Sequence, residues 1–257
     1  KDANDKVGTK LVTEETAHFI IHTDFRDRRA LGQICERYYG ELSRIFGLGR
    51  NEPLWDGKCV IFFFSDEEDF QKFAEKVDNF AGAQQASGYT MLQKDGREIH
   101  IAIPQPKAED ATTGIQAFFS TLIHEIAHAF LHCIREPFSP RPWINEGIAQ
   151  YFSFLNDPQY PRWATHKRLL KQRLASGSLR PLNSLLAMDT MPAADTEGYA
   201  MSWSLVEFLI KTDARKFTTF IQQIKGRTQQ EDALKNAFRT TPENLEAVWR
   251  QYVQNNY

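Results

Sequence analysis

The spacing of apolar residues changes near residue 110, and this change constrains the fold more than any other feature of the sequence. Before that point apolar residues include short continuous runs such as 59–64, which are typical of buried strands. Beyond it they recur every three or four residues, which is the period of amphipathic helices. We therefore expect an α+β protein with a small N-terminal mixed sheet and helices, followed by a mainly helical C-terminal part.

The first hundred residues predict a strand–helix–strand–helix–hairpin unit after a disordered lead-in over 1–10. A turn signal at Lys94, Asp95 and Gly96 separates the last two strands, and Pro104 ends the second of them. The expected strands are 18–23, 59–64, 88–92 and 98–103, and the expected helices are 27–46 and 66–77.

The rest of the chain predicts helices only, with a single plausible seam at the Asn-Asp-Pro turn that begins at Asn156. We interpret 1–157 as an N-terminal α+β part that includes the metal-binding helices, and 158–257 as a helical C-terminal part of one catalytic domain. The expected helices are 111–134, 143–155, 162–174, 199–211, 215–224, 231–237 and 243–255.

Composition excludes several classes of partner and site. The formal net charge is −2, so no basic excess indicates nucleic acid, and the longest apolar run falls far short of a membrane span. Cys35, Cys59 and Cys133 lack the spacing of a thiolate zinc site and predict buried free thiols. No signal-peptide core is visible; a trimmed signal would leave the same sequence, and in that case a secreted or periplasmic location is favoured.

The segment 124–128, His-Glu-Ile-Ala-His, predicts a metal site. His124 and His128 are one helical turn apart and lie off the main apolar stripe of their helix, so both imidazoles can converge on one Zn²⁺. Glu125 lies beside the first histidine, where it can reach a metal-bound water as general base without ligating the metal. The alternative is two packed or solvated histidines beside an ordinary surface carboxylate.

A catalytic zinc site needs a third protein ligand and an open position. His132 lies about 12 Å along the helix from His124, too far to share a metal, so we expect it to be exposed or to support the ligands. Glu146 is the better candidate, 18 positions after His128 (146 − 128 = 18), with Gly147 beside it to allow close approach. Otherwise Glu146 is a carboxylate favoured by the helix dipole.

The two motifs together, His-Glu-Ile-Ala-His and Trp-Ile-Asn-Glu-Gly-Ile-Ala, resemble those of the gluzincin peptidases, which include thermolysin-like enzymes and zinc aminopeptidases. The layout of the whole chain is similar to peptidase MA-like domains. The resemblance implies a zincin-like catalytic domain, metal ligands His124, His128 and Glu146, and Glu125 as base. It thereby implies a zinc metallopeptidase that acts on a peptide or protein substrate.

The resemblance also implies a donor for the oxyanion of the tetrahedral intermediate. Tyr199 is placed like the tyrosine of the zinc aminopeptidases, with His166 as the alternative donor and a packed tyrosine as the structural alternative. Two departures matter. The chain lacks the Gly-Ala-Met-Glu-Asn exopeptidase segment, which favours an endopeptidase, and Gln150 replaces the aspartate of the thermolysin-like subgroup.

The strand 98–103 is the best candidate for a sheet edge along which an extended substrate adds as a further strand. The competing hypothesis for the whole chain is a catalytically silent binding module on a metallopeptidase scaffold. An intact base at Glu125 favours the enzyme, because scaffolds that lose activity usually lose this glutamate. Cleavage preference and oligomeric state are not encoded in any of these patterns.

Overall fold

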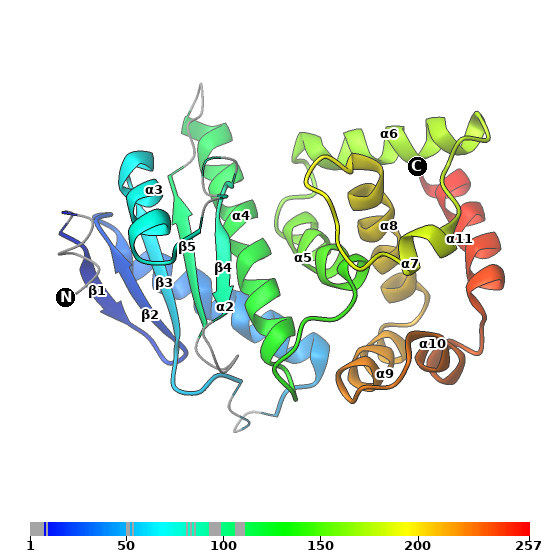
Figure 1. Ribbon diagram of the computed structural model, residues 1–257, viewed down its shortest axis with the longest axis horizontal. Helices are drawn as coiled ribbons and strands as arrows, with labels where there is room; N and C mark the ends of the chain where they lie inside the picture. Colours follow the sequence, from blue (N-terminus) through cyan, green and yellow to red (C-terminus); the bar gives the residue numbers. More distant parts are fainter. Residues whose placement is uncertain are drawn as a thin grey trace. The chain divides into compact units, whose positions relative to one another are not determined.

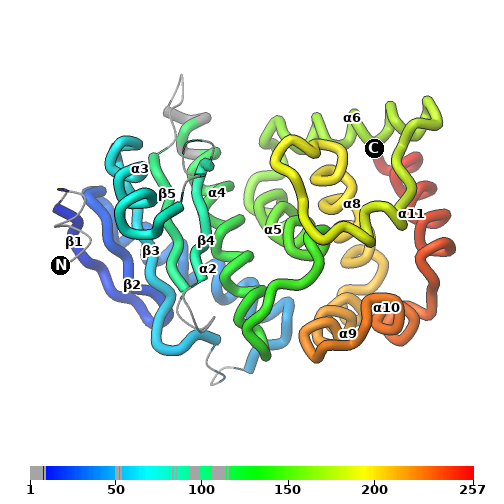
Figure 2. The backbone as a smooth tube through the Cα atoms, in the orientation of Figure 1, coloured from blue at the N-terminus to red at the C-terminus, as the bar shows by residue number. Residues whose placement is uncertain are grey.

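The computed structural model describes residues 8, 10–49, 52, 54–80, 82, 84, 86–92, 99–105 and 111–257. The chain forms two compact units (Figures 1 and 2). Unit 1 comprises Lys1–Arg44 and Gly49–Cys133, and unit 2 comprises Ile45–Leu48 and Ile134–Tyr257. This boundary follows backbone contacts, and it groups the expected helix 143–155 with the later helices. The interpretation of one catalytic domain divided near residue 157 stays a prediction.

Unit 1 is built on a five-stranded mixed sheet with the order β1-β2-β3-β5-β4. β2 pairs in parallel with β3, which pairs in parallel with β5, and the two outer strands are antiparallel to their neighbours. The expected α+β class is confirmed. The strands are β1 (Val12–Glu15), β2 (Phe19–Thr23), β3 (Cys59–Phe64), β4 (Tyr89–Leu92) and β5 (Ile99–Pro104).

Three helices cover this sheet, α2 (Arg28–Phe46), α3 (Glu67–Lys76) and α4 (Ala111–Cys133). Side chains alternate across a strand, so Phe64 and Tyr89 share a buried cluster with Phe73 of α3. Phe63, the neighbour of Phe64 in β3, lies on the opposite face and contacts Phe118 of α4. Asp66 caps α3 by accepting hydrogen bonds from the amides of the first turn, as its sequence predicts.

Two expectations about strands in unit 1 are corrected. The candidate edge strand 98–103 is the inner strand β5, which lies between β3 and β4, so β4 is the edge at that end of the sheet. β1 was not predicted, because Val12 is 46% exposed and the strand shows no apolar alternation. The turn at Lys94, Asp95 and Gly96 lies outside the described residues, although β4 and β5 pair antiparallel as a hairpin requires.

Unit 2 is helical in the part that the structure describes, and its two central helices are α5 (Pro142–Asn156) and α8 (Thr196–Thr212). They pack closely because Gly147 has no side chain: a Cβ there would lie 2.5 Å from the carbonyl oxygen of Ser202. The other helices are α6 (Pro161–Ala175), α7 (Leu182–Leu186), α9 (Ala214–Lys225), α10 (Gln230–Phe238) and α11 (Pro242–Asn256).

Three details of unit 2 differ from expectation. The helical period of residues 143–155 predicts Leu155 on the same buried face as Ile144 and Ile148, but Leu155 is 44% exposed, because it lies in the last turn of α5. The short helix α7 was not predicted, since five residues carry too little periodicity. α8 begins at Thr196, three residues before Tyr199, because Asp195 accepts a hydrogen bond from the Gly198 amide and caps it.

Hydropathy of the helices is moderate throughout. Among the helical segments that the structure describes, none combines the length and apolar character needed to cross a bilayer.

The contact at Gly147 gives a first prediction. In Gly147→Ala the added methyl overlaps the Ser202 carbonyl, so we expect the free energy of unfolding to fall by about 1–3 kcal/mol. Gly40→Ala is the matched control, because a Cβ at Gly40 in α2 meets nothing within 4 Å. That change should stabilise the helix by up to about 1 kcal/mol. Urea denaturation followed by circular dichroism measures both; equal effects of the two substitutions contradict the close packing.

Candidate metal centre

His124 and His128 present two nitrogen ligands at the same point on α4. Their Nε2 atoms are 3.0 Å apart, and the rings are nearly perpendicular with centroids 4.5 Å apart. Two nitrogens that each bind one tetrahedral zinc ion at about 2.0–2.1 Å are separated by roughly 3.3 Å. Both side chains are half-buried. The observed pair therefore fits the donor arrangement that a zinc ion requires, with little movement of either ring.

Glu125 is held in place by a threonine of the edge strand. Its carboxylate Oε2 accepts a hydrogen bond of 2.8 Å from Thr90 Oγ1, which also lies 3.1 Å from the Glu125 carbonyl oxygen. Glu125 is only 7% exposed, so this one donor fixes the orientation of a buried carboxylate. The second carboxylate oxygen is left to accept a proton, as a general base must.

Thr90 is a residue that the sequence alone did not single out. The strand 88–92 was predicted, but no local signal says which of its two faces meets the helix that carries Glu125. Register with β5 settles this, since Thr90 pairs with Ile101 and Tyr89 with Ala102. Tyr89 and Ala102 belong to the cluster under α3, so Thr90 faces α4.

In unit 2, Glu146 and Tyr199 lie near one another on the packed helices α5 and α8. The pKa of Tyr199 is raised to about 12, chiefly by burial, and then by the negative charges of Glu146 and Asp195. The phenol therefore stays protonated at neutral pH and can donate a hydrogen bond. Glu146 itself is half-buried, off the apolar face of α5 as expected.

Gln150 of α5 links this helix to α8 and α6. It is 2% exposed; its amide nitrogen donates to the Tyr199 carbonyl at 3.4 Å, and its amide oxygen lies 2.9 Å from His166 Nε2. Burial, followed by the charge of Arg162, lowers the pKa of His166 to about 4. His166 is thus neutral, buried and bonded to Gln150, which favours Tyr199 over His166 as a donor to substrate.

The start of α8 is fixed by an arginine. Arg180 forms a bidentate pair with Asp195, donating from NH1 to Oδ2 at 2.9 Å and from NH2 to Oδ1 at 2.5 Å. Its guanidinium lowers the pKa of the Asp195 carboxyl. The backbone amide of Arg180 also donates to Glu197 at 2.9 Å. These bonds hold the first turn of α8 and thereby position Tyr199.

Other sequence expectations resolve as follows. His132 is 7% exposed and lies in the last turn of α4, so the alternative that it is exposed is wrong, and the alternative that it supports the ligands stays a prediction. The three cysteines are buried free thiols, as predicted. Burial raises the pKa of Cys35 and of Cys59, so both thiols stay protonated.

The predicted site residues therefore fall into two groups of neighbours. His124, Glu125 and His128 lie together on α4, and Glu146 and Tyr199 lie near one another on α5 and α8.

Comparison with known proteins adds one finding. A family model described as a protein of unknown function (DUF1570) matches residues 118–230, so the chain is similar to that family over this segment. All five predicted site residues lie within it. No curated protein gives a match.

The environment of His166 predicts a specific dependence of stability on pH. Its pKa of about 4 in the folded protein lies below the value near 6.5 in the unfolded chain. Between these values the unfolded state binds a proton that the folded state does not, so stability falls as the pH drops. Proton uptake by His166 in the unfolded chain should lower the free energy of unfolding by about 3 kcal/mol at pH 4.

The measurement is the NMR titration of the His166 ring proton, with urea denaturation of wild type and His166→Gln across the same pH range. The ring should titrate near pH 4, and the substitution should flatten the pH dependence of the free energy of unfolding. A titration midpoint near 6.5 contradicts the buried, neutral assignment.

Proposed function

We propose that this chain is a zinc-dependent hydrolase that cleaves peptide bonds, with Glu125 as general base. The observation that carries the proposal is the pair of histidine Nε2 atoms 3.0 Å apart on α4, beside a carboxylate held by Thr90. Histidine pairs at this spacing, followed by a glutamate on the next helix, are typical of the gluzincin peptidases that the sequence resembles.

His124, His128 and Glu146 are the proposed protein ligands. Two neutral imidazoles and one carboxylate are a donor set that suits zinc and leaves a position for water. A zinc ion held there supplies Lewis-acid activation of a water molecule and of the substrate carbonyl. Only the short segment 134–141 separates α4 from α5, so Glu146 follows the histidines closely in the sequence.

Proton transfer falls to Glu125. Thr90 occupies one carboxylate oxygen, and no described residue donates a hydrogen bond to the other, so that oxygen can take a proton from the attacking water and later deliver it to the leaving amine. The residue is only 7% exposed, which limits the access of bulk water to its carboxylate. A threonine at position 90 therefore has a positioning role, because it acts on the reaction through Glu125.

Stabilisation of the oxyanion falls to Tyr199. Its pKa of about 12 keeps the hydroxyl protonated over the whole neutral range, so it can donate as negative charge develops on the substrate oxygen. The ion pair between Arg180 and Asp195 and the hydrogen bond from Gln150 restrict the helix that carries Tyr199. A donor fixed in advance costs no reorganisation at the moment of reaction.

The corrected strand order supports an extended substrate. β4 is the edge strand, and its Thr90 is the residue that bonds to Glu125. A peptide that added to β4 as a further strand would therefore pass close to the proposed base. This arrangement favours an endopeptidase, because the chain lacks the acidic segment that holds a substrate amino terminus.

Glu125→Gln tests the proposal. The amide keeps the shape of the side chain but cannot take a proton, so we expect zinc content to stay near one equivalent while hydrolysis of a peptide library falls by about 10²–10⁴. Zinc is measured by elemental analysis of protein purified without chelator, and cleavage by mass spectrometry. Glu75→Gln, an exposed carboxylate of α3, is the control and should change neither quantity.

Each outcome decides between hypotheses about the function of the chain. Less than about half an equivalent of zinc in wild type contradicts the metal site. Hydrolysis by Glu125→Gln at the wild-type rate contradicts the role of the base. A wild type that binds zinc fully and cleaves nothing in the library supports the alternative, a silent binding module on a metallopeptidase scaffold.

A further inference from the structure

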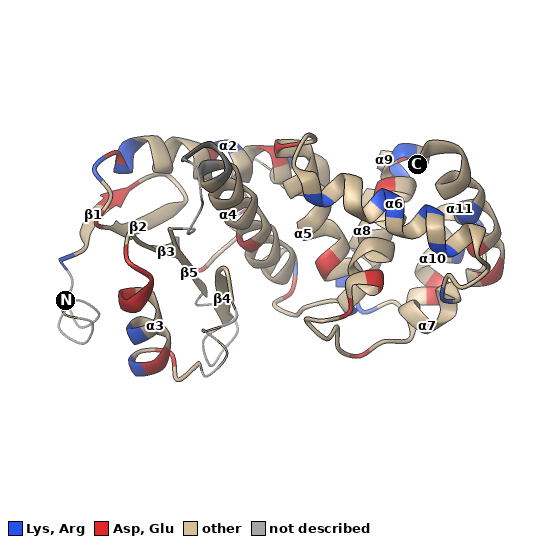
Figure 3. Ribbon diagram, turned by 90° about the horizontal axis from the view of Figure 1, so that it is seen from above, with Lys and Arg blue, Asp and Glu red and all other residues tan. Residues whose placement is uncertain are grey.

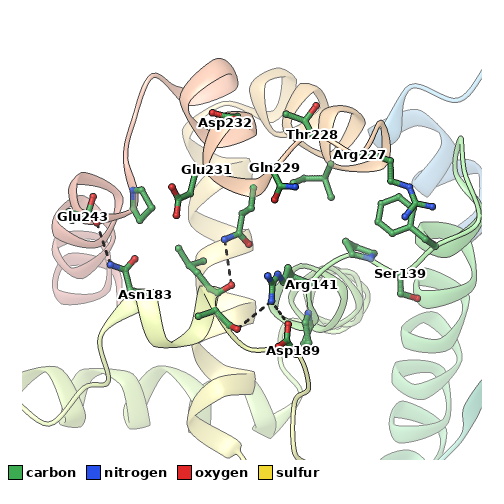
Figure 4. A pocket seen from close by; sticks show the side chains of 18 residues that line it. Ser139, Arg141, Asn183, Asp189, Arg227, Thr228, Gln229, Glu231, Asp232 and Glu243 are labelled. Carbon is green, nitrogen blue, oxygen red and sulfur yellow. Dashed lines mark hydrogen bonds and ion pairs between the residues drawn. The ribbon is translucent and has the colours of Figure 1, made fainter.

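A cleft of about 980 Å³ opens in unit 2, at the end where α5, α10 and α11 begin (Figure 4). Four segments line it: residues 138–142, the region of α7 from 183 to 189, residues 224–232, and Pro242 with Glu243. The volume lies at the upper end of the range for pockets that hold small ligands, so a stretch of peptide fits. We call it the unit 2 cleft.

Both arginines that line the cleft are already neutralised. Arg141 pairs with Asp189, and its guanidinium also donates to the Ala187 carbonyl at 3.3 Å. Arg227 pairs with Glu136 at 3.0 Å. Each pair contributes no net charge to the cleft, so the remaining lining residues set its polarity.

Those remaining charges are negative. Glu231 and Asp232 are exposed in the first turn of α10, and neither has an ion pair with any other residue that the structure describes. Glu243 accepts hydrogen bonds at the start of α11, and these bonds lower the pKa of its carboxyl. Three carboxylates thus line the cleft (Figure 4), and none of them has an ion pair with another residue that the structure describes.

Apolar side chains also line the cleft. Pro140, Pro142 and Pro242 line it, together with Phe138, whose ring lies under the Arg227 guanidinium at 3.8 Å. The fully buried Lys225 also lies over this ring, with its Nζ 4.3 Å from the centroid, and donates to the Phe138 carbonyl. Lys225 is not a lining residue of the cleft, and its Nζ is directed at Phe138.

We propose that the unit 2 cleft binds a lysine- or arginine-bearing segment of the polypeptide substrate. The carboxylates of Glu231, Asp232 and Glu243 take the cationic groups, and the lining prolines receive the aliphatic part of the long side chains. This inference rests on the proposed peptidase function, because the bound segment is a substrate only if the chain cleaves it. The binding itself does not require hydrolysis.

Position along the chain links the cleft to the proposed chemistry. Pro142 lines the cleft and begins α5, and Glu146 follows one turn later, about 6 Å along the same helix axis. A segment bound in the cleft is therefore held near the unit 2 residues of the candidate site. Such remote contacts raise the local concentration of a scissile bond and confer preference for basic substrates.

The cleft contrasts with the helix α6 in the same unit. That helix carries five basic residues and no acidic one, and Figure 3 shows them in blue along it. Cationic peptides are repelled from α6 and attracted to the cleft, which makes charge a selective probe of location. The basic residues of α6 are Arg162, Lys167, Arg168, Lys171 and Arg173.

The test measures binding directly in the hydrolysis-silent Glu125→Gln protein. The probe is a fluorescein-labelled hexapeptide that alternates Ala and Arg, followed by fluorescence polarisation; the same peptide with Glu for Arg is the reference. We expect the Arg peptide to bind more tightly and its Kd to rise with salt. Glu231→Gln with Asp232→Asn should raise that Kd about 5–10-fold.

A matched pair of substitutions controls for net charge. Asp56→Asn with Glu75→Gln removes two exposed carboxylates of unit 1 and should leave the Kd within about twofold. If the α10 double variant fails to fold by circular dichroism, Glu243→Gln decides, with an expected rise of about 2–3-fold.

Equal effects of the cleft and control pairs overturn the inference, as does tighter binding of the Glu peptide. These outcomes leave the proposed function intact if wild type cleaves peptides. If the Arg peptide binds through the cleft but the protein cleaves nothing, the inference about the cleft stands and the proposed peptidase function is contradicted.

Discussion

The rest of the account depends on one helix that presents different chemistry on different faces. α4 buries an apolar stripe against the sheet, with Leu122, Ile126 and Phe130 fully buried. Because a helix places residues four apart on one face, that packing also fixes where His124 and His128 point. The core thus sets the backbone positions of the two histidines, and their Nε2 atoms lie 3.0 Å apart.

Unit 2 achieves the same kind of fixation by another route. The close approach of α5 and α8 at Gly147 places Glu146 and Tyr199 on adjacent helices, and Gln150 ties α8 to α5 and to His166. The phenol is thereby held in a partly desolvated, negatively charged environment, which raises its pKa to about 12. A helix pair with a larger residue at 147 could not bring these groups to the same depth.

Much of this was accessible from the sequence, because helix period and ligand spacing are local properties. The bounds of α4 and α5, the close approach at Gly147 and the buried cysteines follow from neighbours within a few residues. Thr90 could not be found, since its role depends on a strand pairing set by the whole sheet. For the same reason β5 was mistaken for an edge: its position in the sequence just before α4 does not show which strands flank it.

The central claim is that His124, His128 and Glu146 ligate one zinc ion. Anomalous diffraction at the zinc edge from crystals of the zinc-loaded protein tests it most directly. The account predicts a single strong peak about 2.0–2.1 Å from both histidine Nε2 atoms and about 2.0–2.2 Å from a Glu146 carboxylate oxygen, with His132 outside the coordination sphere. No peak at the histidine pair, or a peak whose third protein ligand is not Glu146, would contradict it.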